Sequence, residues 1–160
     1  MQSHTVHTPA IDFSLSDQDG VNHTLSQYKG SYVLLYFYPK DQTPGCTIQA
    51  CELRDSLNDL KKYSVQVLGV STDSVASHKK FASNHHLQFP LLADVDKTVV
   101  TAYDVWRKKS LFGRLFMGIK RESFLIDPEG MIVRHYTNVS PKEHVSAILT
   151  DLKILQNSSS

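Results

Sequence analysis

The feature that most constrains the fold is a continuous apolar run, YVLLYFY, at Tyr32–Tyr38. An apolar run without polar alternation is typical of a central strand that is buried on both faces. Val65–Val70 (VQVLGV) is a second candidate for such a strand. The segment between them, Cys46–Tyr63, carries apolar residues on one helical stripe: Ala50, Leu53, Leu57 and Leu60. The sequence therefore predicts a strand–helix–strand unit with parallel strands and a right-handed crossover, as in an α/β protein.

The remaining segments add hairpins and helices around this unit. Short strand-like runs flank the turn signals DQDG and DPEG, and each pair predicts a β-hairpin. The hairpins are expected at Ile11–Leu15 with Val21–Leu25 and at Ser123–Ile126 with Met131–His135. Helices are expected at Ser74–His86, near Lys97–Tyr103 and at Pro141–Leu155 after the N-cap Ser140, and a short strand at Phe89–Leu92.

Length and composition fit one domain. A chain of 160 residues with 41% hydrophobic residues can bury roughly two-thirds of its unfolded surface. No repeat or linker divides it, so we expect a single domain over residues 1–160, with 156–160 as a frayed tail. The N-terminus lacks a secretory signal, and no apolar run approaches the ~18 residues that span a bilayer. We therefore expect a cytoplasmic protein in a reducing compartment.

The chain contains only two cysteines, Cys46 and Cys51, which are five positions apart. A close pair in a reducing compartment is more often catalytic or metal-binding than structural. Thr43 and Pro44 predict a helix start, with Thr43 as N-cap and Pro44 at the first helical position. Cys46 would lie in the first turn, where free N–H groups and the helix dipole favour a thiolate. This effect contributes only about 2 kcal/mol to a reaction barrier, so fast chemistry requires further groups.

The spacing of the cysteines argues against a static disulfide. On an ideal helix, residues five apart have Cα atoms roughly 8 to 9 Å from each other. That separation exceeds the limit of about 7 Å for a disulfide, so a bond between Cys46 and Cys51 requires the helix to unwind. A redox cycle with local unfolding fits the pair better, although Cys51 alone could also be a small buried hydrophobe.

These residues resemble the active-site signature of the peroxiredoxins. The signature is Pro39-x-x-x-Thr43-Pro44-x-Cys46, and the gap to Cys51 within GCTIQAC is similar to that of the bacterioferritin comigratory protein (peroxiredoxin Q) branch. The resemblance covers nearly the whole chain and includes VLGVSTDS, FPLLAD and KRESFLIDPEG. It implies a thioredoxin fold, in which a central mixed β-sheet is flanked by helices and preceded by an N-terminal β-hairpin.

The resemblance also implies an activity, the thiol-dependent reduction of hydrogen peroxide and organic hydroperoxides. Cys46 would be the peroxidatic cysteine, with a hydroxyl donated by Thr43 and a guanidinium brought by Arg121. Pro39 would shield the pocket from solvent. Cys51 would be the resolving cysteine, which condenses with the Cys46 sulfenic acid to a disulfide. Thioredoxin or a similar dithiol would restore the thiols of a protein that works as a monomer, and no metal, haem or flavin is implied.

Two other functions could use the same cysteine. One is a peroxide sensor or holdase that switches conformation, and the other is a general disulfide oxidoreductase. Thr43 and Arg121 argue against the oxidoreductase, which needs no peroxide-binding pair and normally uses CxxC. Catalytic turnover separates the peroxidase from the sensor.

The segment Trp106–Arg121 contains six basic residues, no acidic residue and several aromatic ones. Such a composition occurs on nucleic-acid and membrane surfaces. Because the net charge of the chain is only +1, we interpret the segment as an exposed loop that delivers Arg121 to the site, and we expect neither partner. Its charge would favour the thiolate of Cys46. His85 and His86 lack the spacing of metal ligands.

Overall fold

The structure is a computed structural model, and it describes residues 1–157. Six strands form one sheet in the order β1-β10-β9-β4-β5-β6. Their bounds are β1 Gln2–Pro9, β10 Met131–Thr137, β9 Glu122–Ile126, β4 Tyr32–Phe37, β5 Val65–Ser71 and β6 Leu91–Ala93. The central strand β4 is parallel to β5 and antiparallel to β9, so the sheet is mixed. The predicted parallel strand–helix–strand unit is confirmed.

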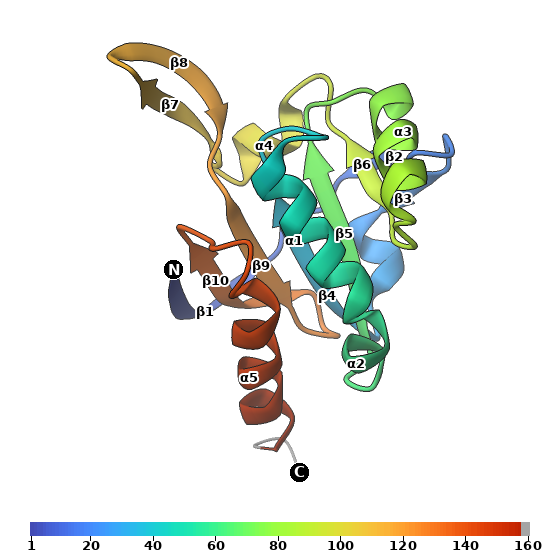
Figure 1. Cartoon of the computed structure of the whole chain (residues 1–160). Coiled ribbons are helices and arrows are strands. Elements are labelled where there is room, and N and C mark those ends of the chain that lie inside the picture. Colours follow the sequence, from blue (N-terminus) through green and yellow to red (C-terminus); the bar gives the residue numbers. More distant parts are fainter. Residues whose placement is uncertain (158–160) are drawn as a thin grey trace.

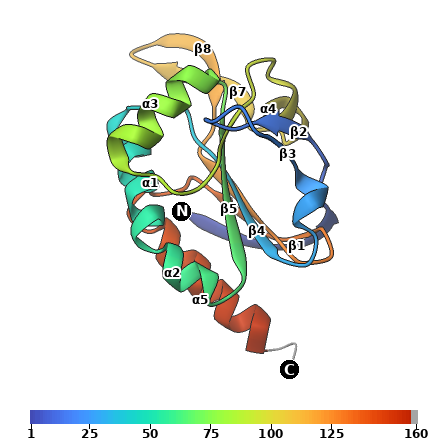
Figure 2. The ribbon, with the colours of Figure 1, turned by 90° about the vertical axis from the view of Figure 1, so that its right-hand side faces the viewer.

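Helices cover both faces of this sheet (Figures 1 and 2). One face packs against α1 (Pro44–Asp55), α2 (Leu57–Lys61), α3 (Val75–His85) and α5 (His144–Asn157). The opposite face packs against the 3-10 helix η1 (Leu25–Tyr28) and α4 (Thr98–Ala102). The predicted N-terminal hairpin is also present, as β2 (Ser14–Ser16) and β3 (Asn22–Thr24).

The apolar run of the central strand β4 contributes side chains to the cores on both faces of the sheet. Leu34 and Tyr36 pack in the core beside α1, α3 and α5, whereas Val33, Leu35 and Phe37 pack in the core beside α4 and η1. All five side chains are buried. Since successive side chains of a strand point to opposite faces, a strand between two helical layers must be apolar throughout.

The helix predicted at Cys46–Tyr63 is interrupted. It consists of α1 and α2, which meet at Ser56 (φ −104°, ψ 5°). The N–H of Ser56 donates to the carbonyls of Glu52 and Leu53, both at 3.1 Å, and thereby closes α1. The apolar stripe continues across the break, because Leu53 and Leu60 are both fully buried.

The predicted start of the last helix is wrong by one turn. Residues 141–143 form a turn, in which the carbonyl of Ser140 accepts hydrogen bonds from the N–H groups of Glu143 and His144, both at 3.1 Å. The helix α5 then begins at His144. Gln156 and Asn157 belong to α5 rather than to a frayed tail, and the rest of the predicted tail, residues 158–160, lies outside the described residues.

Two strand assignments also differ from expectation. The apolar pattern contains no signal for β1, because only Val6 of this edge strand is partly buried. The short strand expected at Phe89–Leu92 is β6, which begins two residues later, after Pro90. The helices expected near these positions, α3 and α4, are present, and the side chain of Ser74 caps α3 by accepting the Ser77 N–H.

The segment Trp106–Arg121 is not a loop, as the sequence predicted, but a β-hairpin. Its strands are β7 (Trp106–Leu111) and β8 (Arg114–Ile119), which pair antiparallel on either side of Phe112 and Gly113. Figure 1 shows the hairpin projecting from one end of the main sheet. Most of its side chains are exposed on both faces, so its sequence lacks the alternation that predicts a half-buried strand. Among residues 1–157, no helix has the length and apolar character needed to cross a bilayer.

Candidate active site

Cys46 lies in the first turn of α1, just beyond the carboxyl end of β4. As predicted, Thr43 is the N-cap, with extended backbone angles (φ −83°, ψ 152°), and Pro44 occupies the first helical position. The carbonyl of Thr43 accepts the N–H of Thr47 at 2.9 Å and begins the helical hydrogen bonds. Cys46 is buried, with only 2% of its surface exposed. The N-terminal end of the helix dipole therefore favours negative charge on a desolvated sulfur.

The guanidinium of Arg121 contacts the sulfur. Its Nη2 lies 3.4 Å from Sγ of Cys46, and its Nη1 donates to Oε1 of Gln49 at 2.6 Å. Arg121 follows the end of β8 and precedes β9, and its carbonyl accepts the N–H of Val139 at 3.1 Å. The structure thus brings Cys46 and Arg121 together from distant parts of the chain. A cation at this distance stabilises a thiolate.

A glycine makes room for this contact. A Cβ atom at Gly45 would lie 3.1 Å from Nη2 of Arg121, closer than most Cβ contacts allow. A side chain there would require the guanidinium of Arg121, or the backbone, to shift by a few tenths of an ångström.

A buried chain of polar groups supports the arginine. Nε2 of Gln49 lies 3.2 Å from Nδ1 of His144, and Nε2 of His144 lies 2.8 Å from Oγ of Ser123. Because Oε1 of Gln49 accepts from Arg121, its amide nitrogen donates to His144, whose other nitrogen then carries the hydrogen. Burial, and secondarily the charge of Arg121, lower the pKa of His144 to about 3. His144 is therefore a neutral link at neutral pH.

The sequence interpretation missed Gln49, His144 and Ser123. Gln49 lies three residues after Cys46 on the same helix face, so a polar residue on this apolar stripe was a detectable signal. The other two residues come from β9 and α5, and no local pattern places either of them near a cysteine.

The hydroxyl of Thr43 was expected to donate to the sulfur of Cys46 or to a peroxide, but it has another partner. Its Oγ1 donates to the carbonyl of Lys40 at 2.8 Å. A hydroxyl has one hydrogen to donate, so donation to the thiolate or to a peroxide requires this group to turn away from Lys40.

Pro39 is half-buried in the loop between β4 and α1, and buried contacts hold this loop. Oη of Tyr38 donates to Oδ1 of Asp41 at 2.6 Å, and the N–H of Asp41 donates to Oδ2 of Asp73 at 2.9 Å. Nδ1 of His78 contacts the second carboxylate oxygen of Asp41 at 2.7 Å. These contacts fix the loop that carries Pro39 into the helix.

Within residues 1–157, Asp41, Asp73 and His78 form a group whose residue types could ligate a metal ion. The two ring nitrogens of His78 face acceptors, Oδ2 of Asp41 at 2.7 Å and the carbonyl of Leu92 at 3.0 Å. The carboxylates also accept other hydrogen bonds, because Oδ2 of Asp73 accepts the N–H of Asp41 and Oγ of Ser71 donates to the same oxygen at 2.6 Å. The group fits a hydrogen-bonded anchor better than a metal centre.

Comparison with known proteins identifies the family. The chain matches the AhpC/TSA family over residues 6–135. It belongs to this family. Peroxiredoxin Bcp of Bacillus subtilis is 45% identical over 144 residues, which are 90% of this chain and 92% of the relative. Peroxiredoxin Bcp of Escherichia coli is 46% identical with the same coverage. The resemblance to the bacterioferritin comigratory protein branch is therefore confirmed, and the chain is a peroxiredoxin.

Solved structures of this branch have the same fold. The bacterioferritin comigratory protein of Xanthomonas campestris, studied for alkyl peroxide reduction, has a TM-score of 0.84 at 37% identity and covers 89% of this chain and 90% of its own. A cysteine-to-serine variant of PrxQ from Xylella fastidiosa has a TM-score of 0.89 at 33% identity, with 97% and 99% covered. The thioredoxin fold expected for this peroxiredoxin is confirmed, and the protein is a thiol-dependent peroxidase.

In this peroxiredoxin both cysteines are free thiols, and α1 is continuous from Pro44 to Asp55. Cys51 is partly buried, whereas Cys46 is buried. The two residues therefore lie on an intact helix, whose geometry keeps their Cα atoms too far apart for a disulfide.

Tyr36 is a further neighbour of the site. Its ring packs against Gly69, where a Cβ atom would lie 2.9 Å from the ring. Burial, followed by the negative charge of Cys46, holds the pKa of Tyr36 well above its usual range. Its buried Oη has no hydrogen-bond partner among residues 1–157. Tyr36 is thus a neutral, largely apolar neighbour of Cys46.

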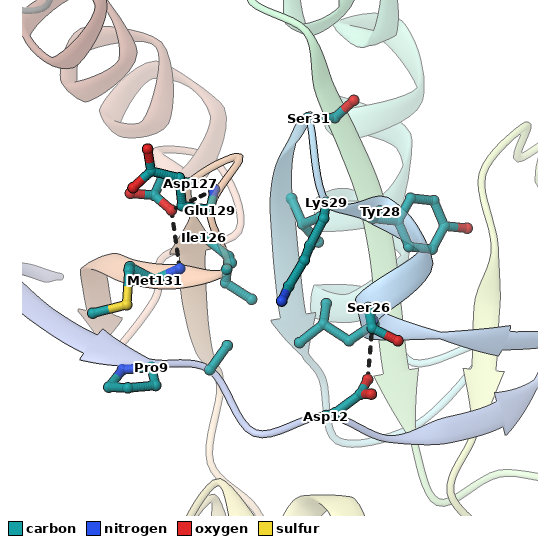
Figure 3. Close-up of a pocket in the computed structure, with 14 residues that line it drawn as sticks. Pro9, Asp12, Ser26, Tyr28, Lys29, Ser31, Ile126, Asp127, Glu129 and Met131 are labelled. Atoms are coloured by element: carbon teal, nitrogen blue, oxygen red, sulfur yellow. Dashed lines mark hydrogen bonds between the residues drawn. The ribbon is translucent and has the colours of Figure 1, made fainter.

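A cavity of about 210 Å³ lies at the opposite end of β4 from the cysteine (Figure 3). Its lining includes Ser31 and Val33, at the start of the strand, and Lys29, whose side chain extends into it. Oδ1 of Asp12 accepts the N–H of Ser26 at one wall. None of the predicted site residues lines this cavity, so it is separate from the candidate site around Cys46.

Proposed function

We propose that Cys46 is the peroxidatic cysteine of this enzyme and that it reduces hydrogen peroxide and alkyl hydroperoxides. The thiolate attacks one peroxide oxygen and the O–O bond breaks. The other oxygen takes a proton and leaves as water or alcohol, while Cys46 is oxidised to a sulfenic acid. The observation that carries the proposal is the 3.4 Å contact between Nη2 of Arg121 and Sγ of Cys46. This cation stabilises the thiolate before the attack and the charge on the leaving oxygen during it.

Two other residues of the loop complete the proposed pocket. The hydroxyl of Thr43 turns from Lys40 toward the bound peroxide and donates its hydrogen there. Pro39 covers the pocket and limits access of water. Both proposals rest on the position of these residues immediately before the first turn of α1, which contains Cys46.

Cys51 is the proposed resolving cysteine. After α1 opens, its thiol attacks the sulfenic sulfur of Cys46, and the condensation releases water and leaves a disulfide. A dithiol reductant, such as thioredoxin, then reduces that disulfide by exchange and is itself oxidised. The proposed site of action is the cytoplasm, where a dithiol pool keeps both cysteines reduced. We propose that the enzyme acts there as a monomer.

The test is peroxide consumption in the presence of thioredoxin and its reductase. We expect Cys46→Ser to abolish consumption of hydrogen peroxide and of tert-butyl hydroperoxide. Cys51→Ser should retain the first turnover and lose the thioredoxin-dependent ones. If Cys46→Ser still consumes peroxide, Cys46 is not the peroxidatic residue. A wild type that stops after one equivalent, even with abundant reductant, acts as a sensor rather than as a peroxidase.

A further inference from the structure

The β7–β8 hairpin ends in exposed apolar side chains. Five of the 11 exposed large hydrophobic residues within residues 1–157 lie between positions 111 and 117. We call these five the hairpin tip: Leu111, Phe112, Leu115, Phe116 and Met117. Phe112, at the turn, is 98% exposed, and Leu115 is 72% exposed. Because a soluble monomer rarely exposes such a patch without a purpose, the tip marks a contact with another molecule.

The exposed side chains of the tip do not stabilise the fold of the chain. β7 and β8 form a two-stranded sheet of their own, separate from the main sheet. Cross-strand neighbours pair apolar with polar residues, as in Lys109 with Phe116 and Ser110 with Leu115. An isolated hairpin of this kind is only marginally stable, so apolar side chains left in water at its end bring it no stability.

The same hairpin concentrates positive charge. Six of the 17 basic residues of the chain lie at positions 106–121, which leaves 11 basic and 16 acidic residues elsewhere. The hairpin is thus cationic on a body that is net acidic. Such a charge distribution orients the molecule, hairpin first, toward an anionic surface.

We propose that the β7–β8 hairpin docks this protein on an anionic lipid surface, with the tip among the acyl chains and the cations at the headgroups. A projecting arm with apolar side chains on both faces would need a matching groove in a protein partner, whereas a lipid interface adapts to any shape. Lys108 and Arg114 have stems long enough to reach headgroup phosphates while their neighbours are buried. The proposal replaces the expectation, based on a loop, that no membrane partner exists.

The base of the hairpin connects this surface to the peroxidase site. β8 continues through Lys120 into Arg121, which contacts Cys46. Burial lowers the pKa of Lys109, and the positive charges of Lys120 and Arg121 lower it further. The side chain of Lys109 therefore lies near enough to Arg121 for their charges to interact. Docking would therefore orient the end of the molecule that carries Cys46 toward the lipid surface, at the base of a hairpin about 20 Å long.

The test is sedimentation of the reduced protein with vesicles at low ionic strength. Vesicles of phosphatidylcholine mixed with phosphatidylglycerol should bind it, and vesicles of phosphatidylcholine alone should not. Phe112→Ser with Leu115→Ser should weaken binding by at least about tenfold, because two apolar side chains lose their burial. Lys108→Gln and Arg114→Gln should each weaken it about fivefold, and added salt should weaken the binding of the wild type. Ile154→Ser, which removes a hydrophobe of α5 that is 55% exposed, should have no effect.

Peroxide reduction in solution shows that each variant is folded, since Phe112 and Leu115 do not contact the peroxidase site. A wild type that stays in the supernatant with anionic vesicles contradicts the proposal. Binding that persists after the Phe112→Ser and Leu115→Ser substitutions contradicts it as well. If the wild type does not bind vesicles but forms a dimer that these substitutions dissociate, the hairpin is instead a contact between copies of the chain.

Discussion

At the scale of single residues, Arg121 links Cys46 to the buried polar groups that begin with Gln49. Its two terminal nitrogens point to different partners, Oε1 of Gln49 at 2.6 Å and Sγ of Cys46 at 3.4 Å. A planar guanidinium can hold both contacts at once, whereas a single ammonium cannot hold both with the same geometry.

The variant Arg121→Lys tests whether both contacts of the guanidinium are needed. We expect the rate of reaction with hydrogen peroxide to fall by about 100-fold, because one donor to the developing charge is lost or misplaced. Arg54→Lys is a matched control, since Arg54 bonds Asp55 and the carbonyl of His85 instead. Unchanged kinetics in Arg121→Lys would show that charge alone suffices.

His144 gives the stability of the protein a defined pH dependence. Its pKa is about 3 in the folded state, against an ordinary value of 6.5. Below pH 6.5 the unfolded chain binds a proton that the folded chain does not, so the free energy of unfolding decreases as the pH falls. The expected contribution is about 1.4 kcal/mol per pH unit until the pH approaches the folded pKa.

Denaturant titrations at several pH values check this prediction. His144→Gln should make the free energy of unfolding less dependent on pH between about pH 6 and pH 4. His7→Gln, on the exposed edge strand β1, is the control and should keep the slope of the wild type. Equal slopes in wild type and His144→Gln would mean that His144 is not buried in its neutral form.

At the scale of elements, the proposed cycle requires α1 both to position Cys46 and to unwind so that Cys51 can reach it. Its first turn positions Cys46, and its continuity separates Cys46 from Cys51 in the dithiol state. We predict that oxidation to the disulfide lowers the protection of amide hydrogens in residues 44–55 against exchange with deuterium. Cys51→Ser treated with peroxide should keep that protection, since it forms no disulfide. An oxidised wild type with a fully protected α1 would contradict the need for unwinding.

The elements that the sequence predicts correctly are those with a strong apolar pattern. The runs of β4 and β5 and the stripe of α1 follow directly from burial between two layers. The segments with no such pattern, β1 and the β7–β8 hairpin, are held by main-chain pairing while their side chains face solvent. The same limit applies to the site, because Cys46, Thr43 and Pro44 form a local signal whereas His144 and Ser123 meet Gln49 only after folding.

At the scale of the whole molecule, one sheet joins two cores. The core beside α1 and α5 contains Leu34, and the core beside α4 contains Leu68. Since both cores share the strands β4 and β5, we propose that residues 1–160 form a single domain that unfolds cooperatively.

Thermal unfolding of two core variants tests this proposal. Leu34→Ala and Leu68→Ala should each destabilise the protein by about 2 to 5 kcal/mol. Both should lower the midpoint of the same transition, whether it is followed by far-ultraviolet circular dichroism or by the fluorescence of Trp106. Separate transitions, each sensitive to only one of the variants, would show two independent units.

The most direct test of the central claim is the intact mass and thiol count of the protein before and after one equivalent of hydrogen peroxide. We predict that the wild type loses two thiols and about 2 Da, whereas Cys51→Ser gains about 16 Da as a sulfenic acid on Cys46. A wild type that keeps both thiols would contradict the claim that Cys46 is the peroxidatic nucleophile.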